Sequence, residues 1–181
     1  MCKHADNTKQ IIDHILGEVY PQLTAKIIYA VNCLRSEQSE APDKYVVMNI
    51  IADLRNEFNS LVTYEQKLVF PSVLKVFLTV KENEPIPNLV ELLKLTKSKE
   101  YKLMHHVKKI DALIEHSLWN SAAQQVLTKA FSHEFIVEKK AWYKMIDERL
   151  NTCNCFKKNY FEMAKFYDQN IHPIKSGNTT K

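Results

Sequence analysis

Three segments of this chain place an acidic or imidazole side chain inside an apolar helical stripe. The first stripe advances by three or four residues at a time and consists of Val47, Ile51, Leu54, Phe58, Leu61, Glu65 and Leu68. The second consists of Leu103, His106, Ile110 and Leu113, and the third of Leu127, Phe131, Glu134, Glu138 and Met145. A carboxylate facing an apolar interior needs a cation or hydrogen-bonding partner. We therefore predict that Glu65, His106, Glu134 and Glu138 converge.

The chemistry that suits such a convergence is metal binding. Carboxylates and imidazoles from facing helices are typical ligands of iron or manganese, and the cores of helical bundles are where dinuclear sites of this kind are built. A second interpretation needs no metal, because Lys67, Lys139 or Tyr64 could neutralise a glutamate. The sequence leaves both open.

Four long helices must position these residues. Pro42 and the pair Pro85 and Pro87 stand in polar stretches that separate segments of helical periodicity. A further break is expected near 117–121, where Ser121 and Gln124 have the spacing of a capping box. The expected helices cover 8–36, 43–81, 88–117 and 121–150, and Pro21 and Pro71 should kink the first two or end them early.

The simplest fold for these elements is all-α, an up-down-up-down four-helix bundle over residues 1–150. Residues 151–181 form a C-terminal extension, in which the aromatic-rich segment 156–167 is expected to make a short helix that packs on the bundle. The chain has 181 residues, of which 45% are hydrophobic and 25% charged, and this balance is typical of one soluble globular domain.

Composition excludes several classes of protein. The chain has only two glycines, Gly17 and Gly177, whereas phosphate-binding loops and dinucleotide-binding turns need several, and so do the hairpins of an all-β domain. Neither a Gly-x-Ser-x-Gly turn nor a cysteine in an activating context occurs, which argues against catalysis through a covalent intermediate. We do not expect an enzyme.

Charge and hydropathy bear on partners and location. The formal net charge is +4, but lysines and acids alternate along the chain, so nucleic acid is not an expected partner. The first residues are too polar for a signal peptide, and no apolar run approaches the ~20 residues that span a bilayer. We expect a cytoplasmic protein with four reduced cysteines and no membrane partner.

The cysteines also allow a second interpretation. Instead of being free thiols, Cys2, Cys153 and Cys155 could bind zinc together with His4, but this signal is weak because the Cys-x-Cys spacing differs from the usual Cys-x₂-Cys.

The motifs around the inward polar residues resemble those of hemerythrin-like domains. The segment 64–71, Tyr-Glu-Gln-Lys-Leu-Val-Phe-Pro, resembles the signature of their second helix, the segment 104–106 their third-helix histidine, and Glu134 and Glu138 their fourth-helix pair. The order of these motifs matches across residues 8–150. The resemblance implies a non-haem di-iron centre that binds oxygen or nitric oxide, or that serves iron–sulfur centre repair.

The chain departs from that family at two histidine positions. Leu61 stands four residues before Glu65, and Glu134 stands four before Glu138, where the family has histidines. On the first helix the family's histidine position falls on Asp13, with His14 one residue away. The resemblance therefore implies a candidate metal-ligand set of Glu65, His106, Glu134 and Glu138 with Asp13 or His14.

Three functions follow from these observations. The first is a non-haem iron binding or sensing module for oxygen, nitric oxide or iron stress, with an altered site. The second is a metal-free helical interaction scaffold, with a protein as its partner, that has lost the di-iron centre. The third, an oxidase-type enzyme with a carboxylate di-metal centre, is the least favoured, because a second Glu-x-x-His pair is missing.

Overall fold

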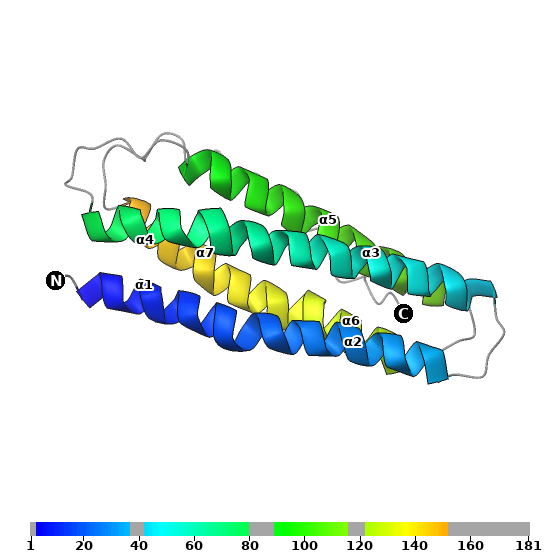
Figure 1. Cartoon of the computed structure of the whole chain (residues 1–181). Coiled ribbons are helices and arrows are strands. Elements are labelled where there is room, and N and C mark those ends of the chain that lie inside the picture. The colour runs from blue at the N-terminus through cyan, green and yellow to red at the C-terminus, as the bar shows by residue number, and fades with distance from the viewer. Residues whose placement is uncertain (1–2, 37–41, 80–88, 116–121, 152–181) are drawn as a thin grey trace, which may run out of the picture.

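The computed structural model describes residues 3–36, 42–79, 89–115 and 122–151, and all of these are helical (Figure 1). The elements are α1 (Lys3–His14), η1 (Ile15–Val19), α2 (Tyr20–Ser36), α3 (Pro42–Tyr64), η2 (Glu65–Val69), α4 (Phe70–Thr79), α5 (Leu89–Glu115), α6 (Ala122–Lys129), η3 (Ala130–Phe135) and α7 (Ile136–Asn151). They join into four long helices, which confirms the all-α prediction for this part of the chain. The short helix expected within 156–167 lies outside the described residues.

Three of the long helices contain a π-helical turn instead of a kink or a break. Two of these turns, η1 and η2, end two residues before Pro21 and Pro71. A proline has no N–H and leaves the carbonyl four residues earlier without its α-helical partner, and a π turn is one way for a helix to pass such a point. In each turn the next N–H bonds five residues back, from Tyr20 to the carbonyl of Ile15 and from Phe70 to that of Glu65. The predicted interruptions are thus local changes of helical register.

Each π turn changes which residues face the interior. Because it adds one residue to a turn, two consecutive side chains are buried at or just after it: Val19 with Tyr20, Val69 with Phe70, and Ala130 with Phe131. This shift lets one long helix keep facing the core along its whole length. It also rotates the residues that follow away from the positions that a regular 3.6-residue period predicts.

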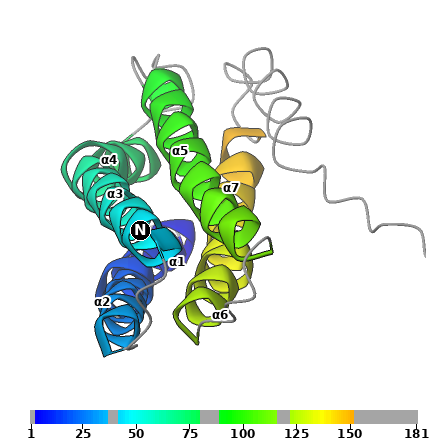
Figure 2. The same ribbon diagram turned by 90° about the vertical axis from the view of Figure 1, so that its right-hand side faces the viewer.

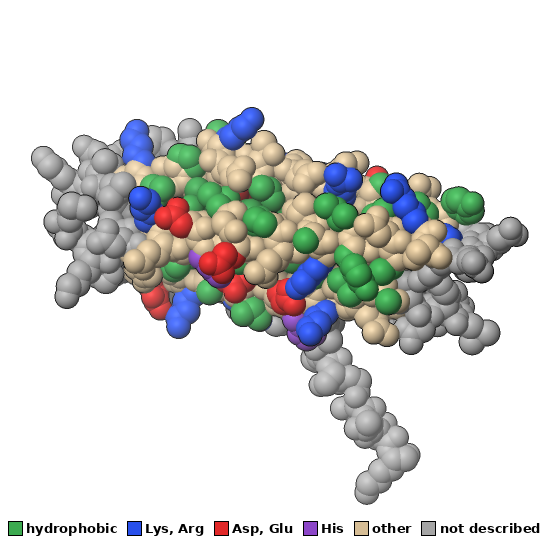
Figure 3. Space-filling view, turned by 60° about the horizontal axis from the view of Figure 1, so that its bottom comes forward, with side chains coloured by type: hydrophobic (Ala, Val, Ile, Leu, Met, Phe, Trp, Pro, Cys, Tyr) green, Lys and Arg blue, Asp and Glu red, His purple; other side chains and the backbone are tan. Residues whose placement is uncertain are grey.

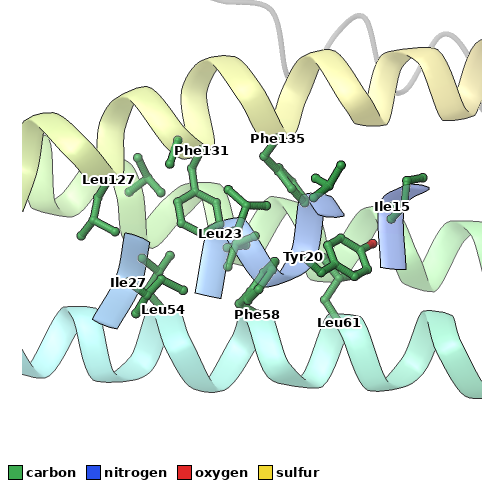
Figure 4. Packing of buried hydrophobic residues seen from close by; sticks show 14 of the residues in the cluster. Ile15, Tyr20, Leu23, Ile27, Leu54, Phe58, Leu61, Leu127, Phe131 and Phe135 are labelled. Atoms are coloured by element: carbon green, nitrogen blue, oxygen red, sulfur yellow. The ribbon is translucent and has the colours of Figure 1, made fainter. Parts of the chain in front are cut away.

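The four long helices pack side by side in a bundle-like arrangement, which Figure 2 shows from one end. The first long helix contacts the second and the fourth through α2, and α3 lies along α5. In the centre, Phe58 stands edge-on to both Tyr20 and Phe131, with ring centroids 5.6 and 5.7 Å apart (Figure 4). No helix in the described part of the chain has the length and apolar character needed to cross a membrane.

Candidate functional site

Glu65 is completely buried at the start of η2, as its stripe predicts. The ammonium group of Lys139, on α7, donates a hydrogen bond to one of its carboxylate oxygens. The hydroxyl group of Tyr20, on the first long helix, donates to the other oxygen. Both oxygens of this core carboxylate are therefore satisfied by side chains from two other helices.

A second buried carboxylate, Glu100 on α5, completes the cluster. Glu100 is only 2% exposed, and one of its oxygens lies 3.2 Å from Nζ of Lys139. The same oxygen accepts a hydrogen bond of 3.0 Å from the hydroxyl of Tyr143. Lys139 thus lies between two carboxylates that come from different helices. We call Glu65, Glu100, Lys139, Tyr20 and Tyr143 the core charge cluster.

Burial and neighbouring charges shift the pKa values of three groups in this cluster, Glu100, Tyr20 and Lys139. It raises the pKa of Glu100, although Lys139 and Tyr143 act in the opposite direction. Burial raises the pKa of Tyr20 well above its ordinary value of 10.0. For Lys139, burial alone lowers the pKa, but Glu65, Tyr20 and Glu100 together raise it by more, so the net pKa lies well above 10.5. The amine is therefore held as an ammonium ion.

In the core charge cluster, one ammonium group faces two carboxyl groups. The ammonium group balances the charge of one carboxylate, and the burial that raises the pKa of Glu100 makes the charged form of this side chain more costly than it is in water. Oε2 of Glu100 is buried without a hydrogen-bond partner among the described residues. An unpaired oxygen in the core is less costly on a neutral acid than on a carboxylate.

The other predicted ligands lie apart from this cluster, near the protein surface. Glu134 and Glu138 are 39% and 36% exposed, respectively. Glu134 forms an ion pair with Lys26, and Glu138 lies 3.9 Å from Nε2 of His14. Nδ1 of His14 in turn lies 3.3 Å from Glu18.

His14, Glu18, Glu134 and Glu138 line a hollow of about 160 Å³ between the first and last long helices. Figure 3 shows acidic and histidine side chains close together on this face. Asp13 is exposed and does not line the hollow, and His106 is half-buried on α5 with its Nδ1 unpaired in the described structure.

The expected inward position of Glu134 and Glu138 is wrong because of the π turn η3. The extra residue in 130–135 shifts the register, so Phe135, Lys139 and Trp142 face the core instead.

Glu100, on α5, was missed by the sequence analysis for a simpler reason. The second stripe extends one turn back from Leu103, and reading it from residue 100 would have placed this glutamate inside.

The described residues do not fit the metal centre that the hemerythrin resemblance implies. Among them, no three histidine, cysteine or acidic side chains lie together as metal ligands would. At the one point where two core carboxylates meet, the space between them holds an ammonium group, which cannot act as a ligand. A metal ion there would have to displace Lys139 into an apolar interior.

Comparisons of the chain with protein-family models, curated proteins and solved structures found no match.

Proposed function

We propose that this chain is a metal-free helical interaction module, an up-down-up-down four-helix bundle related in plan to hemerythrin-like domains. The observation that supports this most is the position of Lys139 between Glu65 and Glu100. A cation attached to the chain does there what a bound metal ion would do for buried carboxylates, which is to offset their charge. The cytoplasmic location predicted from the sequence is part of this proposal.

The geometry around Lys139 suits a permanent resident of the core. Its side chain is 3% exposed, and Nζ lies 5.6 Å from the ring centroids of both Tyr20 and Phe135. An ammonium group has three N–H donors. Carboxylates lie within ion-pair distance on two sides of the Lys139 ammonium group, and the rings of Tyr20 and Phe135 lie beside it. This environment stabilises the cation from several sides, so the carboxylates do not need a further positive ion.

The outer surface supports a binding role. Eight large hydrophobic side chains are strongly exposed in the described structure: Ile28, Tyr29, Tyr45, Val46, Leu68, Leu95, Tyr101 and Val137. They lie on α2, α3, η2, α5 and α7, so apolar surface is available on several sides of the bundle. With a core occupied by aromatic side chains and ion pairs, the outside of the bundle is where a partner can bind. We therefore favour a protein partner over a small ligand.

Metal analysis of the full chain tests the proposal against the iron-sensing alternative. The protein would be reconstituted anaerobically with Fe²⁺, and separately with Mn²⁺ and Zn²⁺, then desalted and analysed for metal. We expect less than about 0.1 ion per chain and no near-ultraviolet band of an oxo-bridged ferric pair. One or two iron ions per chain, lost in a Glu65→Gln variant and retained in Glu148→Gln on the exposed face of α7, would overturn it.

A further inference from the structure

A groove runs along the outside of the bundle where α3 and η2 meet α5. It has a volume of about 510 Å³ and is lined by Asn59, Ser60, Thr63, Tyr64, Lys67, Leu68 and Lys99. We call it the α3–α5 groove. It is separate from the core charge cluster, since Glu65 faces inward from the same π turn from which Lys67 and Leu68 face outward.

Exposed apolar surface lies in the groove and beside it. Leu68 is 46% exposed, and Leu95, one turn before Lys99 on the same side of α5, is 52% exposed. Tyr64, which also lines the groove, is half-buried, and its hydroxyl donates to the carbonyl of Leu92 at 3.4 Å. Burial raises the pKa of Tyr64, so its phenol stays neutral. Leu68 and Tyr64 inside the groove, with Leu95 exposed one turn along α5 from Lys99, offer an apolar strip along which a third helix can pack.

Two lysines border this strip. Nζ of Lys99 donates to the Ser60 hydroxyl at 2.8 Å and stands 5.6 Å above the centre of the Tyr64 ring, while Lys67 is exposed. Within the described residues, neither lysine has a carboxylate at ion-pair distance. The groove therefore combines an apolar strip with uncompensated positive charge.

We propose that the α3–α5 groove binds an acidic amphipathic helix of a partner protein. This inference rests on the proposed function and adds the chemistry of the partner. Leucine-like side chains of the helix would pack against Leu68, Leu95 and Tyr64, and its glutamates or aspartates would pair with Lys67 and Lys99. Helices that bind in grooves use this division between an apolar face that anchors and charges that select.

Charge argues against the chain's own C-terminal segment as the occupant. Residues 152–181 carry the lysines Lys157, Lys158, Lys165, Lys175 and Lys181 but only two acids, Glu162 and Asp168. A segment with this excess of positive charge does not complement Lys67 and Lys99. An occupant that carries acidic side chains complements these two lysines better than this segment does.

Fluorescence anisotropy with two synthetic peptides tests the proposal on the full chain. Both are amphipathic helices of about 18 residues, or five turns. They share one leucine face, and the remaining positions are glutamate in one peptide and lysine in the other. We expect the glutamate peptide to bind, more tightly at low salt, and the lysine peptide to bind at least about tenfold more weakly.

Matched variants locate the binding. Lys67→Glu with Lys99→Glu, and separately Leu68→Ser, should each weaken binding of the glutamate peptide by about tenfold or more. Lys108→Glu with Lys140→Glu makes the same change in charge at exposed positions of α5 and α7 that do not line the groove, and it should leave binding nearly unchanged. Melting temperatures of all variants would show that they fold.

Several results would overturn the proposal. These are equal binding of both peptides, no binding of either, or equal weakening by both pairs of lysine substitutions. Self-association of the chain that Leu68→Ser abolishes would assign the groove to a second copy instead. None of these results depends on metal content, so a failure here is distinct from a failure of the metal-free function.

Discussion

Nζ of Lys139 lies 3.2 Å from a carboxylate oxygen of Glu100, although the two residues belong to the last and third long helices. Both side chains are only 3% exposed. Because Lys139 also pairs with Glu65, three helices meet at one ammonium group in the core. Stability and pH response should therefore depend on this group more than on any surface ion pair of the chain.

Replacing Lys139 with methionine should strongly destabilise the protein. The substitution fills a similar volume but leaves Glu65 and Glu100 without a cation in the core. Removing one partner of a buried ion pair typically lowers the free energy of unfolding by about 3–5 kcal/mol. Urea denaturation followed by circular dichroism measures the change. Lys140→Met, at the exposed neighbouring position, should stay within about 0.5 kcal/mol of the native protein.

A compensated variant keeps this prediction testable if Lys139→Met does not fold. Combining Lys139→Met with Glu65→Gln and Glu100→Gln removes the charges together, and uncharged replacements of buried ion pairs are often neutral or stabilising. We expect the triple variant to be more stable than Lys139→Met alone. Equal or lower stability would contradict the role of the ammonium group as the counter-charge of the cluster.

Glu100 should make the protein less stable as the pH rises through the mildly acidic range. Its pKa in the folded state is raised above the ordinary value of 4.5 by burial, so the folded protein retains a proton that the unfolded chain has lost. Stability then falls with rising pH between the unfolded and folded pKa values. Glu100→Gln should flatten this slope by up to about one proton, as measured by denaturation at a series of pH values. If Glu148→Gln, at an exposed position, flattens it equally, the assignment to Glu100 is wrong.

Alkaline pH should destabilise the fold through Tyr20 and Lys139. Both folded-state pKa values lie well above their ordinary values of 10.0 and 10.5, so each group contributes stability that is present below its ordinary pKa and is lost as the pH rises above it. Tyr20→Phe should reduce the loss of stability per pH unit above about pH 10. Tyr101→Phe on the surface is the matched control. An unchanged alkaline slope in Tyr20→Phe would count against the burial of the Tyr20 hydroxyl as the cause of its raised pKa.

Gly17→Ala should stabilise the protein. Gly17 is exposed within the π turn η1, and a Cβ atom added there would meet nothing within 4 Å. Removing the flexibility of glycine from a helix raises stability by about 0.5–1 kcal/mol. Thermal denaturation measures the gain. The reciprocal change Ala25→Gly, on the exposed side of α2, should lower stability by a similar amount, and a loss with Gly17→Ala would mean that η1 needs glycine at this position.

Much of the secondary structure could be predicted because its causes are local. Prolines and polar stretches mark the ends of the helices, and the apolar period marks their extent. The expected helices 43–81 and 88–117 therefore include all the described helical residues of Pro42–Thr79 and Leu89–Glu115 except Pro42, and their other ends lie outside the described residues. The burial of Glu65 also followed from its stripe. The register of the last helix did not, because no proline follows η3 to mark the π turn.

The sequence by itself determined that the described chain would be helical and that acids would enter an apolar interior, since both are properties of residue type and spacing along one segment. Only the tertiary structure decided which acids these are and what meets them. A single extra residue in η3 exchanged Glu138 for Lys139 on the inner side of the last helix, and packing brought Glu65 and Glu100 to its ammonium group. Whether these side chains meet depends on how three helices are rotated relative to one another, and the sequence of any single helix does not determine this rotation.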